Sequence, residues 1–244
     1  YVSELVEDSG HVVSTSANMA QGPEIVPRSI RLSILSMAMA IDMGYDEENV
    51  RTVGVAGLIH DWGWFHFDEA LRDATQTLDN DQWQLIQQHP THSVRYISQI
   101  TGISELTCLV CNQVHELMDG SGYPRGIKGD AIHIFARILG VADAFISLVT
   151  PYRGRPPTIP YDAMVYMLHQ VKQGRFDSKV VRALLTTNSM YPVGSHVQLD
   201  DGATATVLRP NPADYMKPVV MQLVDERGLR IDPPHERPII NLAD

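Results

Sequence analysis

The stretch from 132 to 149 constrains the fold of this chain most, because it is apolar on nearly every side of a helix. Its charged residues are Arg137 and Asp143, which lie on different faces of a helix and so cannot neutralise each other. A helix that is hydrophobic all round is buried among other elements. A buried carboxylate is costly unless it is paired. Asp143 therefore needs a metal ion or a basic side chain from elsewhere in the chain.

Helical signals continue through most of the chain. Asp46, Ser104 and Asp177 stand where N-caps are expected to begin helices. Beyond Tyr191 the pattern changes to short apolar runs separated by turn residues, which predicts strands at 197–199, 204–208, 219–224 and 239–242. We predict a mainly α protein in three parts: a linker or short helix at 1–27, a helical domain at 28–188 and a small β domain at 189–244.

Composition excludes several classes of function. The 244 residues carry 19 Lys and Arg against 29 Asp and Glu, a net charge of −10, which argues against broad electrostatic binding to nucleic acid or anionic membrane. No apolar stretch is long enough for membrane insertion. The chain has only 2 cysteines, so a disulfide scaffold is excluded and a cytoplasmic location is expected. Because it begins at Tyr1 rather than Met, we expect it to be part of a longer chain.

Two histidine motifs place polar groups at helix ends. His60 and Asp61 follow an apolar helix, and such a pair can bind one metal ion while the carboxylate bridges to a second. An ordinary helix end with a surface histidine and a capping aspartate is the alternative. His89 precedes Pro90, which excludes it from the α region and predicts an imidazole at a corner between helices. An exposed turn histidine remains possible there, and His92 is expected to face solvent.

A third motif, His115-Glu116, lies near the end of the helix that Ser104 begins and precedes the segment 119–130. That segment, called the GYP loop below, is rich in glycine, and long loops in compact domains tend to be functional or disordered. Its specific turn residues favour a structured, functional loop. Cys108 and Cys111 share a helix stripe with His115, a pattern that fits two small core residues better than a metal site.

These motifs, in this order and at these intervals, resemble the HD-GYP family. The resemblance rests on His60-Asp61, His89-Pro90, the run HELMDGSGYPRG at 115–126 and the run ARILGVAD at 136–143. It implies an HD-type helical bundle followed by a small C-terminal β module. It also implies a bacterial signalling enzyme that hydrolyses cyclic di-GMP, or a related cyclic dinucleotide, to pGpG or GMP. The implied cofactor is a divalent transition metal, Fe or Mn, with one or two ions bound.

The resemblance further implies roles for individual residues. His60 and Asp61 are expected to be catalytic, with Asp61 bridging between ions. The expected metal ligands are His60, Asp61, His89, His115, Asp143 and Glu24. The residues expected to shape the substrate site or hold substrate phosphates are Tyr123, Pro124, Arg153 and Arg155. The implied partners are the cyclic dinucleotide and, through the GYP loop, diguanylate cyclase domains.

Some positions depart from the family pattern. Arg28 and Val114 stand where histidines are expected, and Trp64 stands where a lysine is expected. A guanidinium cannot bind a metal ion, but it offers Asp143 a counter-charge. Three functions therefore stay open: a working phosphodiesterase of cyclic dinucleotides, a degenerate module that binds cyclic dinucleotides or other proteins, or a hydrolase of another phosphate ester.

Overall fold

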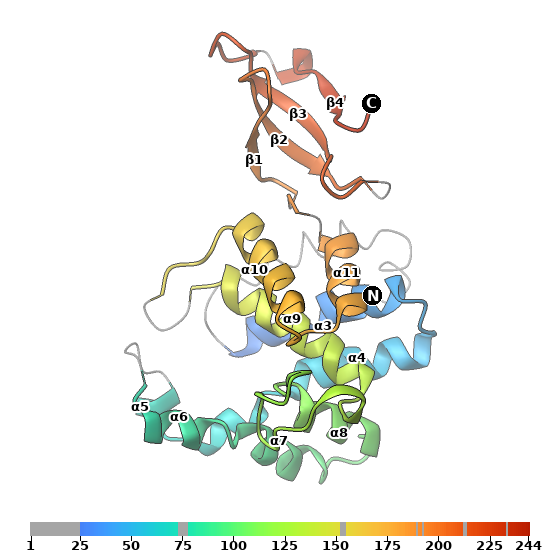
Figure 1. Cartoon of the computed structure of the whole chain (residues 1–244), viewed down its shortest axis with the longest axis vertical. Helices are drawn as coiled ribbons and strands as arrows, with labels where there is room; N and C mark the ends of the chain where they lie inside the picture. The colour runs from blue at the N-terminus through green and yellow to red at the C-terminus, as the bar shows by residue number, and fades with distance from the viewer. Residues whose placement is uncertain are drawn as a thin grey trace.

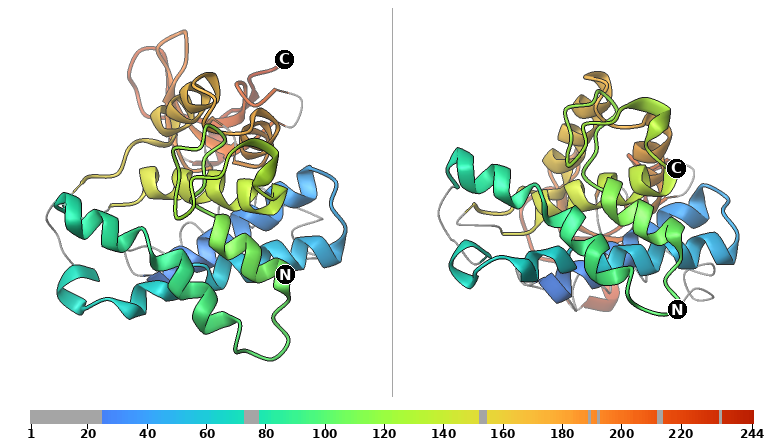
Figure 2. Two further views of the ribbon diagram at one scale, coloured as in Figure 1. Left: turned by 60° about the horizontal axis from the view of Figure 1, so that its bottom comes forward. Right: turned by 90° about the horizontal axis from the view of Figure 1, so that it is seen from below.

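The computed structural model describes residues 25–72, 78–151, 155–188, 190–191, 193–211, 214–232 and 234–244. Its helices form one body, and a small sheet lies beyond that body at the C-terminal end (Figure 1). Seen from other sides, α5 and α6 lie along one edge of the helical body (Figure 2). In the described part of the chain, no helix is both long enough and apolar enough to cross a membrane. The fold class expected from the sequence, mainly α with a C-terminal β module, is confirmed.

The helices follow one another along the described part of the chain. They are α3 (Ile25–Asp42), α4 (Glu47–Ile59), η1 (Trp62–His66), α5 (Glu69–Arg72), α6 (Asn80–Ile86), α7 (His89–Ile97), α8 (Glu105–Gln113), η2 (Gly129–Ala131), α9 (Ile134–Val149), α10 (Pro160–Lys172) and α11 (Ser178–Asn188). α3 thus begins within the segment expected to be a linker, and residues 1–24 lie outside the described part. The predicted caps are confirmed at Asp46 and Ser104, whose side chains accept hydrogen bonds from Asn49 N and Thr107 N.

α9 is the buried helix that the apolar stretch predicts. It packs against α3, α4, α8, α10 and α11, and most of its side chains, Asp143 included, are buried. It begins two residues later than expected because His133 caps it, with Nδ1 accepting a hydrogen bond from Phe135 N at 3.2 Å. The surrounding helices therefore pack around the Asp143 carboxylate in a mainly apolar core.

A tight contact joins α7 to the end of α4. A Cβ atom added at Gly63 in η1 would lie 1.9 Å from His89 O and 2.7 Å from Ser93 N, so only glycine fits there. The buried Ser93 hydroxyl accepts a hydrogen bond from Gly63 N at 2.7 Å and donates one to His60 O. Through these two hydrogen bonds, the hydroxyl connects the segment that carries His60 and Asp61 to the helix that begins with His89.

The C-terminal module is an antiparallel sheet in the order β1 (His196–Gln198), β2 (Thr204–Arg209), β3 (Val219–Val224) and β4 (Ile239–Asn241), with η3 (Pro234–Glu236) before the last strand. The strands lie where the apolar runs predict them, to within a residue. Ala205, Val207 and Val220 form a small core. The Tyr191 side chain packs against this core and against the core of the helical body, so it joins the two.

Replacement of Ser93 by alanine tests the link between α7 and the end of α4. Ser93→Ala leaves the buried Gly63 N–H without its acceptor and should lower the free energy of unfolding by about 1–3 kcal/mol. Ser98→Ala is the matched control, because that hydroxyl is exposed at the end of the same helix and should change stability by less than about 0.5 kcal/mol. Urea denaturation measures both, and equal stability of the two variants would contradict the proposed link.

Candidate metal centre

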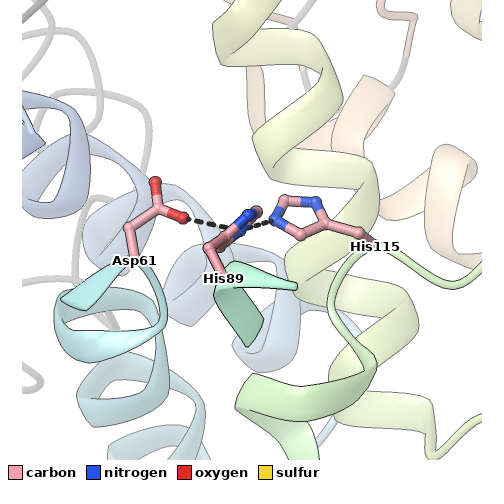
Figure 3. Close-up of side chains that lie close together, drawn as sticks. All are labelled: Asp61, His89 and His115. Carbon is pink, nitrogen blue, oxygen red and sulfur yellow. Dashed lines mark hydrogen bonds and ion pairs between the residues drawn. The ribbon is translucent and has the colours of Figure 1, made fainter. Parts of the chain in front are cut away.

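Three side chains converge in the helical body from segments far apart in the sequence (Figure 3). Asp61 follows α4, His89 begins α7 and His115 follows α8. His89 Nε2 lies 3.3 Å from Asp61 Oδ1 and 2.9 Å from His115 Nε2. The ligand atoms of the three residues all lie within 4.8 Å of one another, and we call them the ligand group.

Backbone carbonyls orient two of the imidazoles. His60 Nδ1 lies 3.0 Å from Gly57 O, and His89 Nδ1 lies 2.8 Å from Ile86 O. A carbonyl can only accept, so each Nδ1 carries the proton and each Nε2 faces Asp61. Metal-binding histidines are commonly oriented by this kind of second hydrogen bond. His60 Nε2 lies 3.2 Å from Asp61 Oδ1, so His60 contacts the ligand group without being one of its three members.

Burial and charge set the protonation states of the ligand group. Burial, followed by the neighbouring His89 ring, lowers the pKa of His115 to about 3, so this imidazole is neutral at physiological pH. Burial alone would raise the pKa of Asp61, but attraction to His60 and His89 holds it well below its ordinary value. Neutral imidazole and ionised carboxylate are the forms that bind metal ions.

The donor set fits a divalent cation. His60 Nε2 and Asp61 Oδ1 are both buried, and neither has a hydrogen-bond partner among the described residues. A metal ion would satisfy both atoms. Nitrogen ligands about 2.0–2.1 Å from a metal ion lie about 2.9–3.4 Å apart, which agrees with the 2.9 Å between His89 Nε2 and His115 Nε2. The residues present therefore suit a metal ion held by one carboxylate and two or three imidazoles.

Asp143 lies beside the ligand group but is paired with a protein cation. Arg28 Nη2, from the first turn of α3, donates hydrogen bonds to Asp143 Oδ1 and Ser147 Oγ, both at 2.6 Å. The counter-charge expected at Arg28 is thus found. Asp143 Oδ2 is 3.8 Å from His115 Nδ1, and Oδ1 is 4.0 Å from His60 Nε2. Metal binding by Asp143 stays a prediction.

Aromatic rings flank the ligand histidines. Trp64 stacks on His89, with ring centroids 5.1 Å apart, and Tyr123 stacks on His115 at 4.8 Å. The GYP loop is folded back onto the segment after α8, because Tyr123 N donates to His115 O at 3.1 Å and Arg125 N to Glu116 Oε1 at 2.8 Å. The loop thereby holds the Tyr123 ring against a candidate ligand.

Other expected residues have no contact with the ligand group among the interactions described, or cannot be placed. Glu24 and Arg153 fall outside the described residues. Arg155 is exposed and donates a hydrogen bond to Ser147 O, and Pro124 is half-buried in the GYP loop. His92 does not simply face solvent as expected: it is half-buried, and its ring stacks on His66 at 3.7 Å.

Two residues near the ligand group show where sequence patterns succeed and where they fail. Cys111 is buried, with Sγ 3.7 Å from Ala56 O, as expected of a core residue. The sequence reasoning missed Ser93. Its spacing of one helical turn from His89 is the signal that would have indicated a residue on the same helix face.

Removal of the Arg28 side chain should destabilise the protein. Arg28→Ala leaves Asp143 buried without its counter-charge, and we expect a loss of about 3–5 kcal/mol at pH 7 in metal-free protein. Burial alone would raise the pKa of Asp143, whereas Arg28 holds it below its ordinary value. The stabilisation is therefore present above about pH 4 and is lost as the pH falls further.

The control for this experiment is Arg51→Ala, which removes an exposed ion pair with Glu47 and should cost no more than about 0.5 kcal/mol. Urea denaturation of both variants at pH 7 and below pH 4 provides the measurement. If Arg28→Ala were no more harmful than Arg51→Ala at pH 7, the ion pair would not be what stabilises Asp143 in the core.

Comparisons with known proteins identify the family to which the chain belongs. A family profile described as HD domain matches residues 7–180. The chain is 32% identical over 190 residues to the 3'3'-cGAMP-specific phosphodiesterase 1 of Vibrio cholerae, covering 76% of this chain and 43% of that protein. It is 28% identical over 201 residues to the cyclic di-GMP phosphodiesterase PA4108 of Pseudomonas aeruginosa, covering 82% and 48% respectively. The chain thus spans less than half the length of these relatives.

Solved structures share the fold. An HDG"Y"P protein of Bdellovibrio bacteriovorus, Bd1817, matches with a TM-score of 0.55 and 20% identity over 66% of this chain and 51% of that one. A cyclic GMP-AMP-specific phosphodiesterase of V. cholerae matches with a TM-score of 0.51 and 18% identity over 72% of this chain and 47% of that one. Together these matches confirm the resemblance to HD-GYP proteins, and the family profile shows that the chain belongs to the HD domain family.

Proposed function

We propose that this chain is a metal-dependent phosphodiesterase that hydrolyses a cyclic dinucleotide, cyclic di-GMP or 3'3'-cGAMP. The observation that carries the proposal is the buried ligand group, in which a carboxylate and two imidazoles converge and His60 Nε2 lies 3.2 Å from the same carboxylate. The names of the relatives supply the substrate class, since phosphodiesterases of both dinucleotides align with most of the chain.

Asp61, His89 and His115 would hold the metal ion, with His60 as a fourth ligand. Iron or manganese is the metal we propose, because imidazole and carboxylate suit both. The ion would supply a Lewis acid that polarises the phosphodiester and activates the attacking water. Arg28 takes the place of a further ligand and neutralises Asp143, so we propose one strongly bound ion rather than two.

The chain's own residues prepare this reaction in three ways. The backbone carbonyls of Gly57 and Ile86 fix the orientation of His60 and His89, so no reorganisation is needed when the ion or substrate binds. Trp64 and Tyr123 cover the outer faces of the ligand imidazoles and restrict their contact with water. Arg28 offsets the charge of Asp143, which lessens the repulsion that an anionic substrate would meet.

Metal content and turnover test the proposal together. Protein purified with Mn²⁺ or Fe²⁺ under reducing conditions should contain about one ion per chain and should convert cyclic di-GMP or 3'3'-cGAMP to linear products. His89→Ala should lower metal affinity by at least about 10–100-fold and abolish turnover. His169→Ala, which removes an exposed histidine on α10, should change neither. Elemental analysis and chromatography of the products provide the readouts, and no turnover with either metal would refute the proposal.

A degenerate binding module is the second candidate, and the ion pair between Arg28 and Asp143 favours it. In this case the protein would bind a cyclic dinucleotide without cleaving it, or would dock diguanylate cyclase domains through the GYP loop. The exposed loop residues Ser121 and Arg125 leave room for such docking.

A double substitution tests the second candidate. Arg28→His with Val114→His restores two imidazoles beside the ligand group and should raise the metal content above that of the wild type. Elemental analysis of both proteins, purified in parallel, gives the comparison. An unchanged metal content would argue that the substitutions at 28 and 114 are not what limits metal binding.

A further inference from the structure

We propose that Trp83 is a stacking residue for a purine base of the substrate, an inference that rests on the proposed function. Trp83 lies on α6, and its side chain is 46% exposed. Its ring meets the Tyr123 ring at a centroid distance of 6.2 Å and an interplanar angle of 77°. Tyr123 in turn stacks on His115 of the ligand group. An exposed indole is thus connected to the candidate metal centre through a single intervening ring.

The position of Trp83 is fixed by the same elements that fix His89. α6 begins with a reciprocal cap, in which Asp79 Oδ1 accepts from Gln82 N at 2.8 Å and Gln82 Oε1 accepts from Asp79 N at 3.1 Å. One turn beyond Trp83, Ile86 is buried, and its carbonyl oxygen holds His89 Nδ1. Trp83 is therefore held in place relative to a ligand histidine, although nearly half of its surface is open to solvent.

The chemistry around Trp83 favours a flat, uncharged ring of the substrate at this place. A large exposed aromatic side chain beside a polar site is typical of a ligand-binding surface. Trp83 and Tyr123 meet nearly at right angles, so a ring stacked on the indole would present its edge to Tyr123. In a cyclic dinucleotide each purine is joined to the phosphate through one ribose. A phosphate bound at the ligand group therefore brings a purine into this neighbourhood.

Substitution of Trp83 tests the proposal with the metal-loaded chain. Because base stacking on an aromatic residue is worth about 5- to 150-fold in affinity, Trp83→Ala should raise KM for cyclic di-GMP and 3'3'-cGAMP by that factor, with kcat nearly unchanged. Trp83→Phe, which keeps an aromatic face, should recover most of the loss. The matched control is Tyr166→Ala, whose ring on α10 is 45% exposed and should leave KM unchanged.

Two further readouts separate this inference from the proposed function. Glycerophosphoethanolamine is a phosphodiester without any aromatic ring, so Trp83→Ala should hydrolyse it as fast as the wild type does. Calorimetry of cyclic di-GMP binding to metal-free protein should show a dissociation constant raised by the same factor as KM. If the wild type binds the dinucleotide without cleaving it, the proposed function fails while the role of Trp83 is still measured by binding.

Three results would overturn the inference. Equal KM and equal dissociation constants for Trp83→Ala and the wild type would show that no base contacts the indole. An equal loss on glycerophosphoethanolamine and on the dinucleotides would assign Trp83 a purely structural role. Neither binding nor turnover of any dinucleotide by the wild type would overturn this inference and the proposed function together.

Discussion

Two buried carboxylates are the constraint on which the rest of this structure depends. Asp61 and Asp143 are 5% and 6% exposed, inside a body of helices whose core is mainly apolar. Ionised carboxylates are tolerated there only with compensating charges or donors. Arg28, His60, His89 and His115 supply these compensating groups, so the positions of α3, α4, α7 and α8 are tied to the same electrostatic requirement.

The two carboxylates are compensated in different ways. Asp143 receives a guanidinium from within the chain, at 2.6 Å, and so needs nothing from solution. Asp61 Oδ1 instead faces the Nε2 atoms of His60 and His89 at 3.2 and 3.3 Å, while the Nδ1 atoms of both rings lie against backbone carbonyls. Only the second arrangement calls for an external cation. The site therefore combines a permanent protein cation with a place for an exchangeable one, and this combination distinguishes it from a site that relies on metal ions alone.

Much of the fold and part of the candidate site could be predicted from the sequence, for identifiable reasons. The apolar stretch around Asp143 requires a buried helix, because no other arrangement removes so many hydrophobic side chains from water. The caps at Asp46 and Ser104 are local hydrogen bonds, so a few neighbouring residues determine them. The resemblance that the order of the motifs carries predicted the fold, whereas the metal-binding roles of the ligand candidates stay predictions. Long-range geometry was less accessible: the paired Ser93 hydroxyl and the stack of His92 on His66 depend on how α7 meets η1, which local patterns do not encode.

The adjacency of His60 and Asp61 at the end of α4 has a consequence for how this chain can change over evolution. Both side chains reach the same cluster only because the helix from Glu47 to Ile59 ends at one particular angle about its axis. Inserting or deleting one residue within that helix would turn the pair by about 100°, away from His89. The need to keep His60 and Asp61 beside His89 therefore fixes the length of α4. Insertions and deletions should be tolerated only in segments that do not change the positions of these side chains.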